Sequence, residues 1–361
     1  MDCFDVEACG DSLAFFALTE RLRLSKLSSV SFLKEGEHMK AIRIHKFGPS
    51  EDVLQYEEVP TPEPGAGELL IKVEAASLNR ADLGLRKGTY RISPDALPVI
   101  PGREFAGTVA KIGTGVKEFK VGDRVVAYPS LGGYAELATA KVTEVRPIPN
   151  GVTSMQAAAL PTVFLTAWFG LLEDGKLKSG EWLLVQAGSS GVGTAAIQIA
   201  KHLGAKVIAT TGNEDKTRRL RQLGADVTID NSQDVFALET MRATDNRGVD
   251  VVLEMIGGEV YEKSLQVLTP GGRLVSIGGA FGATPEPPPT LTEGRKATRF
   301  SITNHLKAKP QDFQQLDTIL KLVQEKKFQA VIGKTFPLAE TRAAQRYLEG
   351  REHFGKVMLT M

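Results

Sequence analysis

The chain of 361 residues has very little cysteine, since its only two, Cys3 and Cys9, lie within the first ten residues. Residues 10–361 therefore cannot contain a disulfide of their own or a zinc site built on cysteine thiolates. The sequence also lacks any apolar run of the roughly 18 residues that a membrane-spanning helix needs. It lacks an excess of charge of either sign, because 44 Lys and Arg nearly balance 43 Asp and Glu. This composition predicts a cytoplasmic protein without a nucleic-acid or membrane partner.

What is present is typical of a globular protein: 42% of the residues are hydrophobic and 24% are charged, over a length sufficient for two or three domains. Residues 1–38 differ from the rest. Their acidic start, Asp2 to Asp11, argues against a transit peptide, and their apolar section is too short for a secretory signal. We expect residues 1–38 to be an N-terminal extension that is disordered or not native, with Met39 as the natural start.

The remainder contains two kinds of pattern. Residues 40–150 carry short β-prone runs that Gly and Pro interrupt about every ten residues, which predicts a small β-barrel or sandwich. From about residue 160, apolar strands alternate with helical stretches, which predicts an α/β fold with a doubly wound parallel sheet. Its helices are expected at 192–203, 214–223, 233–243 and 259–268. Further on we expect an edge strand in FSITN (300–304), a helix at 311–326, a strand in VIGKTF (331–336), a helix at 338–349 and a closing strand in KVMLT (356–360).

The most informative stretch is WLLVQAGSSGVG (182–193), in which an apolar strand runs into a glycine-serine turn and then a helix. A helix start carries unpaired N–H donors and a positive dipole end, so it favours an anion. Compared with G-x-G-x-x-G, Gly188 and Gly193 hold the outer positions and Ser190 takes the middle one. An ordinary strand-to-helix turn is the alternative. Because the turn follows the first strand of the parallel set, we favour a dinucleotide site.

Taken together, the chain resembles the zinc-independent members of the medium-chain dehydrogenase/reductase superfamily, specifically the zeta-crystallin-like quinone oxidoreductase family. The similarity covers residues 39–361 in order and rests on these motifs: LNRADLGLRKGTY (78–90), PGREFAGTVAKIG (101–113), VGDRVVAY (121–128), GGYAEL (132–137), LPTVFLTAW (160–168), AGSSGVG (187–193), LGAD (223–226), GVDVVLEMIGG (248–258), LTPGGRLVSIG (268–278) and FGKVMLT (354–360). It implies a GroES-like β-rich catalytic domain in two parts, 39–160 and 304–361, around a Rossmann NADP-binding domain at 161–303.

The resemblance also implies where zinc would bind in the alcohol dehydrogenases of the superfamily. The corresponding positions carry Asn79, Arg103 and approximately Thr162. Arginine stays protonated and has no lone pair for a metal, so Arg103 is incompatible with ligation. The five histidines are scattered without ligand spacing and are interpreted as surface or packing residues: His38, His45, His202, His305 and His353. We expect no metal.

The end of the second parallel strand indicates the cofactor. Its tip, Thr210-Thr211-Gly212, has no carboxylate that would repel a 2′-phosphate. Lys216 and Arg219 follow and can pair with that phosphate, a role that the resemblance gives to Lys216. We predict NADPH; Glu214 or Asp215 serving a ribose instead is the alternative. The turn, the strand ends and the resemblance together predict the following cofactor-binding residues: Thr166, Gly188, Ser189, Ser190, Gly191, Val192, Gly193, Thr211, Lys216, Arg219, Ile256, Gly257, Gly278 and Lys356.

Hydride transfer without a metal needs an acceptor that is already electron-poor. Asn79 and Tyr90 are the predicted catalytic residues: Asn79 can donate an amide N–H, and Tyr90 aligns with the proton donor of related enoyl-thioester reductases, with half-buried packing as the alternative. We therefore predict an enzyme, a homodimeric, NADPH-dependent quinone oxidoreductase that reduces a small-molecule quinone or α,β-unsaturated carbonyl. The alternatives are an enoyl-thioester (CoA or carrier-protein) reductase and a non-catalytic NADPH-binding protein.

Overall fold

The computed structural model describes residues 38–89, 92–278 and 291–361. The account below concerns the compact unit Met39–Met361. The predicted N-terminal extension, apart from its last residue, and the predicted catalytic Tyr90 lie outside the described residues.

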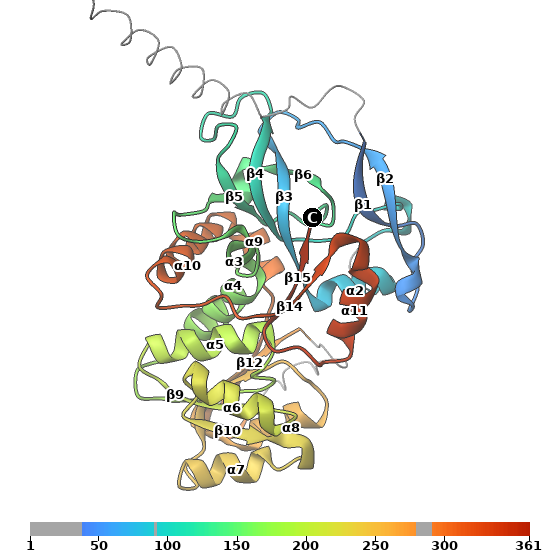
Figure 1. Ribbon diagram of the computed structural model, residues 1–361. Helices are drawn as coiled ribbons and strands as arrows, with labels where there is room; N and C mark the ends of the chain where they lie inside the picture. The colour runs from blue at the N-terminus through green and yellow to red at the C-terminus, as the bar shows by residue number, and fades with distance from the viewer. Residues whose placement is uncertain (1–37, 90–91, 279–290) are drawn as a thin grey trace, which may run out of the picture. The chain divides into compact units, whose positions relative to one another are not determined.

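Six parallel strands form the sheet expected in the second half of the chain. They are β8 (Trp182–Val185), β9 (Lys206–Thr211), β10 (Val227–Asp230), β11 (Val249–Glu254), β12 (Leu268–Ile277) and β13 (Lys296–Phe300). Their order is β10-β9-β8-β11-β12-β13, so that the first strand in the chain lies centrally beside the fourth. The labelled strands β9, β10 and β12 of this sheet lie in the lower half of Figure 1. This 3-2-1-4-5-6 order is that of a Rossmann fold, and it reverses between β8 and β11.

Four helices connect these strands. They are α5 (Gly191–His202), α6 (Glu214–Leu223), α7 (Phe236–Ala243) and α8 (Glu259–Gln266). The predicted helix at 214–223 is confirmed at both ends. Helix α7 begins three residues later than predicted because Asn231–Gln233 form a 3-10 turn, which leaves Phe236 as the first helical residue.

A second sheet of seven strands forms the β-rich domain. Its strands are β3 (Glu68–Leu78), β4 (Phe105–Ile112), β5 (Arg124–Ala127), β6 (Leu137–Lys141), β7 (Val145–Pro147), β14 (Ile332–Pro337) and β15 (Lys356–Thr360). Their order is β14-β15-β3-β4-β5-β7, with β6 pairing on β3. The last strand, β15, is thus inserted between β14 and β3, antiparallel to β3. The expected return of the C-terminal segment to the β-rich domain is confirmed. A separate pair of strands is made by β1 (His38–Ile44) and β2 (Leu54–Pro60).

The remaining helices are α2 (Arg80–Lys87), α3 (Ser154–Ala158), α4 (Pro161–Phe169), α9 (Ile302–Ala308), α10 (Gln315–Gln324) and α11 (Thr341–Glu349). A π-helical turn follows α4 at Gly170–Asp174, and 3-10 turns lie at Glu51–Val53, Pro94–Ala96, Val142–Glu144, Thr292–Gly294, Pro310–Gln314 and Leu338–Glu340. Helix α4 is buried on nearly all sides in the core cluster that also contains β8 and α5. In the described parts of the chain, no helix has both the length and the apolarity to cross a bilayer.

The prediction of a strand over FSITN (300–304) is wrong beyond its first residue. Strand β13 ends at Phe300, and Ser301 caps helix α9 by accepting a hydrogen bond from the Asn304 amide. A serine before an apolar residue favours an N-cap over a continued strand. The β-prone composition of the segment led to the wrong prediction. The prediction that this strand lies at the sheet edge is confirmed, because β13 is the last strand of the parallel sheet in the described chain.

Candidate active site

A cavity of about 1060 Å³ lies where the strand order of the parallel sheet reverses. Its wall contains the residues that follow β8 and β11, together with parts of α2, α4 and the C-terminal segment 348–357. Open α/β sheets bind ligands at this point. The predicted site residues that line it are Asn79, Thr166, Ser189, Ser190, Gly191, Val192, Thr211, Lys216, Ile256, Gly278 and Lys356. Gly188, Gly193, Arg219 and Gly257 are outside the lining.

The glycine-serine turn is shaped by its own backbone. A Cβ atom on Gly193 would lie 2.5 Å from the Ala187 carbonyl oxygen, and the Gly193 amide donates to Ser190 Oγ at 3.0 Å, which caps helix α5. A Cβ atom on Gly191 would lie 2.8 Å from Val163 Cγ1 and 2.9 Å from Lys356 Cδ. The turn thus fits the pyrophosphate of a dinucleotide, because it brings bare backbone and a helix N-terminus to the cavity.

The tip of β9 lies beside this turn and is uncharged, as the sequence indicated. Thr211 Oγ1 donates to Ser189 Oγ at 3.2 Å, which joins the strand tip to the turn. Lys216 lines the cavity and its Nζ donates to the Arg351 carbonyl oxygen at 2.7 Å. Burial and the neighbouring Arg219 lower the pKa of Lys216. Arg219 itself lies 3.8 Å from the centroid of the Phe354 ring.

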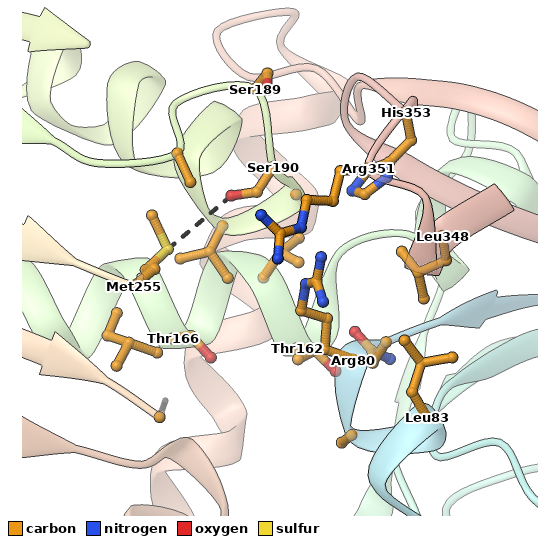
Figure 2. A pocket seen from close by; sticks show the side chains of 18 of the residues that line it. Arg80, Leu83, Thr162, Thr166, Ser189, Ser190, Met255, Leu348, Arg351 and His353 are labelled. Carbon is orange, nitrogen blue, oxygen red and sulfur yellow. Dashed lines mark hydrogen bonds between the residues drawn. The ribbon is translucent and has the colours of Figure 1, made fainter. Parts of the chain in front are cut away.

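Two cations that sequence reasoning missed line the cavity: Arg351 from the C-terminal segment and Arg80 from helix α2. Figure 2 shows Arg351 and Arg80 next to each other in the cavity, and His353 is also part of the wall. Burial, and then the positive charge of Arg351, lowers the pKa of Arg80. Arg80 lies next to Asn79 in the sequence, but nothing in the spacing indicates that residues near 350 would join it.

His353 is a buried histidine in this wall, with 8% of its surface exposed. Burial, reinforced by the charges of Arg80, Lys216 and Lys356, lowers its pKa to about 4. Its Nδ1 has no hydrogen-bond partner among the described residues. The side chain is therefore neutral at pH 7, and its Nδ1 is left for a ligand or water in a wall that also contains Arg80, Lys216 and Arg351.

A polar cluster surrounds the predicted catalytic Asn79, which lines the cavity and caps helix α2. Lys356 Nζ lies 2.8 Å from both Asn79 Oδ1 and Glu104 Oε1. Glu104 also accepts a hydrogen bond from the Thr162 amide at 2.7 Å. Asn79 and Thr162 are two of the positions matched to zinc ligands, and the Lys356 ammonium group already lies between the Asn79 and Glu104 oxygens. With the Arg103 cation adjoining them, the residues present do not fit a zinc ion.

The wall beyond Thr166 is largely apolar. Thr166, Leu83 and Met255 point into the cavity from α4, α2 and the end of β11 (Figure 2). Ile277, Phe300 and Ile302 continue this wall. Such a surface suits an unsaturated or aromatic acceptor more than a charged one.

One histidine predicted to be isolated has acidic neighbours in space. His305 Nε2 lies 2.8 Å from Asp312 Oδ2, and Glu173 is 4.0 Å from the other ring nitrogen. Their ligand atoms all lie within 4.8 Å of one another. The ring also stacks on Phe169, with centroids 4.3 Å apart. We interpret the group as a surface ion-pair network, because Glu173 also pairs with Lys309.

Comparison with known proteins matches both halves of the chain. Residues 65–150 match the alcohol dehydrogenase GroES-like domain, and residues 223–359 match a family described as zinc-binding dehydrogenase. The quinone oxidoreductase of Rattus norvegicus is 32% identical over 326 residues, covering 90% of this chain and 98% of the relative.

Solved structures are similar along the same span. Escherichia coli quinone oxidoreductase complexed with NADPH has a TM-score of 0.82 at 29% identity, over 89% of this chain and 100% of that one. The CurK enoyl reductase has a TM-score of 0.80 at 31% identity, over 90% and 99%. The predicted fold class, a GroES-like domain with a Rossmann sheet, is confirmed.

Proposed function

Because this chain belongs to the quinone oxidoreductase family of the medium-chain dehydrogenase/reductase superfamily, we propose that it is an NADPH-dependent reductase of a quinone or an α,β-unsaturated carbonyl. The observation that carries the proposal is the two-ended cavity. One end is the glycine-serine turn at the switch point, and the other is an apolar wall beside Asn79. Its volume of about 1060 Å³ suits a dinucleotide with a small acceptor next to it.

The cations around the strand tip support NADPH as the cofactor. Lys216 and Arg351 line the cavity near the uncharged Thr211, where a 2′-phosphate would be stabilised by charge-assisted hydrogen bonds. The acidic alternative is weaker, since Asp215 pairs with Arg218 at 2.5 Å and neither Asp215 nor Glu214 is part of the lining. Thr166 remains the proposed contact of the cofactor near the reacting end.

NADPH, when bound, supplies the hydride; this chain binds and orients the acceptor. The apolar wall excludes water from the acceptor, and the Asn79 amide donates a hydrogen bond to its carbonyl oxygen, which stabilises the growing negative charge. Tyr90 remains the proposed proton donor. Because the acceptor is already electron-poor, no metal is required to polarise it.

Two activity panels test this proposal. NADPH oxidation is followed by absorbance with small quinones and with enones, and we expect turnover on at least one panel. Absence of NADPH oxidation with every quinone and every enone would refute the reductase proposal. If NADPH then raised the melting temperature of the protein, a non-catalytic NADPH-binding role would replace it.

An enoyl-thioester reductase is the second candidate, favoured by the similarity to the CurK enoyl reductase over nearly the whole chain. Its assay uses crotonyl thioesters of coenzyme A and of a short pantetheine. A kcat/KM on these thioesters above that on every quinone would select it.

We also propose that the protein is a homodimer in the cytoplasm. Strand β13 is at the edge of the parallel sheet in the described chain and could pair with its counterpart in a second copy. Light scattering after gel filtration measures the mass directly, and a monomer at micromolar concentration would overturn the dimer. Fractionation of the source cells tests the location.

A further inference from the structure

Lys356 is a buried lysine, 4% exposed, whose ammonium group is fully engaged. Its Nζ donates to the Leu78 carbonyl oxygen at 2.9 Å, to Asn79 Oδ1 at 2.8 Å and to Glu104 Oε1 at 2.8 Å. An ammonium group has three N–H donors, so all three are used. Lys356 therefore has no donor left for a cofactor or an acceptor, although its side chain lines the cavity.

Glu104 is the anion that balances this charge. It is completely buried and accepts hydrogen bonds from Lys356, the Ser77 hydroxyl, Asn79 Nδ2 and the Thr162 amide. Burial on its own raises the pKa of Glu104, but Lys356 and the donated hydrogen bonds outweigh it and leave the pKa below the ordinary value. A buried carboxylate with this set of donors stays charged at pH 7 and holds its partners in place.

Asn79 lies between the two charges. Its Oδ1 accepts from Lys356 and its Nδ2 donates to Glu104 at 2.8 Å, so a flipped amide would turn its N–H groups to the ammonium and its oxygen to the carboxylate. Its backbone N–H donates to Asp82 Oδ2 at 2.7 Å. One Nδ2 hydrogen remains, and it has no hydrogen-bond partner within residues 38–89, 92–278 and 291–361. Asn79 is 7% exposed and lines the cavity.

We propose that Lys356 and Glu104 are positioning residues, which fix the amide of Asn79 so that its second N–H meets the acceptor's carbonyl oxygen. This proposal rests on the proposed reductase function. It assigns Lys356 a role through Asn79, not as a proton donor or a phosphate ligand. Because the Lys356 stem packs on Gly191 of the cofactor turn, the same side chain keeps the acceptor's hydrogen-bond donor in register with the bound dinucleotide.

The test compares Asn79→Ala, Lys356→Met and the double variant. We expect Asn79→Ala to lower kcat about 10²-fold, and Lys356→Met to lower it at least about tenfold through a misoriented amide. In the double variant, kcat should match that of Asn79→Ala within about twofold, because Lys356 acts only through Asn79. The Kd for NADPH, measured by fluorescence, should stay within about twofold in all three. Lys72→Met, an exposed lysine on β3, is the matched control.

Lys356→Met leaves a buried carboxylate without its cation, so a variant with both Lys356→Met and Glu104→Gln guards against misfolding. It keeps a neutral pair of similar size and should fold with the same loss of kcat. The proposal is overturned by wild-type kcat in Lys356→Met or in this pair, by losses that multiply with Asn79→Ala, or by an NADPH Kd that weakens as much as kcat falls. A wild-type protein that oxidises no NADPH with any acceptor would instead refute the proposed function.

Discussion

Replacing Lys216 by alanine tests how the cavity selects its cofactor. Lys216 is half-buried beside Thr211, and its Nζ lies 2.7 Å from the Arg351 carbonyl oxygen, at the place proposed for the 2′-phosphate. A hydrogen bond to a charged group contributes about 1.5–3 kcal/mol. Partial exposure screens it, so about 1.5 kcal/mol is expected. That loss corresponds to about a tenfold rise in the KM for NADPH.

The KM for NADH should hardly change, since NADH has no 2′-phosphate. Steady-state oxidation of both cofactors at a saturating quinone measures the two values. Arg218→Ala is the control, because Arg218 is on the same helix but pairs with Asp215 and does not line the cavity. It should leave both constants within about twofold. Equal losses for NADPH and NADH in Lys216→Ala, or an unchanged KM for NADPH, would refute the reasoning.

Three further outcomes follow from the turn and from His353. Gly193→Ala should destabilise the fold by about 1–3 kcal/mol, because the new Cβ would lie 2.5 Å from a fixed carbonyl oxygen. Chemical unfolding measures this loss. Gly212→Ala is the control, because its new Cβ would have nothing within 4 Å and its stability should stay near that of the wild type. Ser190→Ala should cost about 1 kcal/mol through the lost cap of α5, and an unchanged unfolding midpoint would contradict that role. The pKa of His353 is about 4 in the folded protein against an ordinary value of 6.5. Between these values the unfolded chain binds a proton that the folded protein does not, so the free energy of unfolding is highest above pH 6.5 and falls as the pH drops toward 4. Between pH 6.5 and pH 4 the free energy of unfolding of the wild type should fall by about 3 kcal/mol more than that of His353→Gln. Parallel pH profiles of unfolding for the two proteins would disprove this.

The features that could be predicted from the sequence are local ones. The glycine-serine turn and helix α6 are encoded by residues that are neighbours in the chain, and the alternation of strands and helices constrains the sheet. The uncharged tip of β9 at Thr211 could likewise be predicted from residues that are neighbours in the chain. Each of these depends on backbone conformation over a few residues.

The parts that could not be predicted depend on distant pairs. Lys356 meets Asn79 across 277 positions, and its contact with Glu104 spans 252. No periodicity or spacing signals such a pair, because either residue alone is compatible with a solvated surface. The strand prediction after Phe300 failed for a different reason. The N-cap formed by Ser301 outweighed a β propensity that extends over only a few residues.

The central place of β15 has a consequence for biosynthesis. The strand fills the gap between β14 and β3, and its first residue, Lys356, bonds to a carbonyl 278 positions earlier. Residues 75–78 of β3, which pair with β15, therefore leave the ribosome long before their partner strand exists and stay unpaired on that side while the whole Rossmann sheet is made. Synthesis that stalls before residue 356 would yield a chain with a formed dinucleotide fold and an incomplete second sheet that is prone to aggregation.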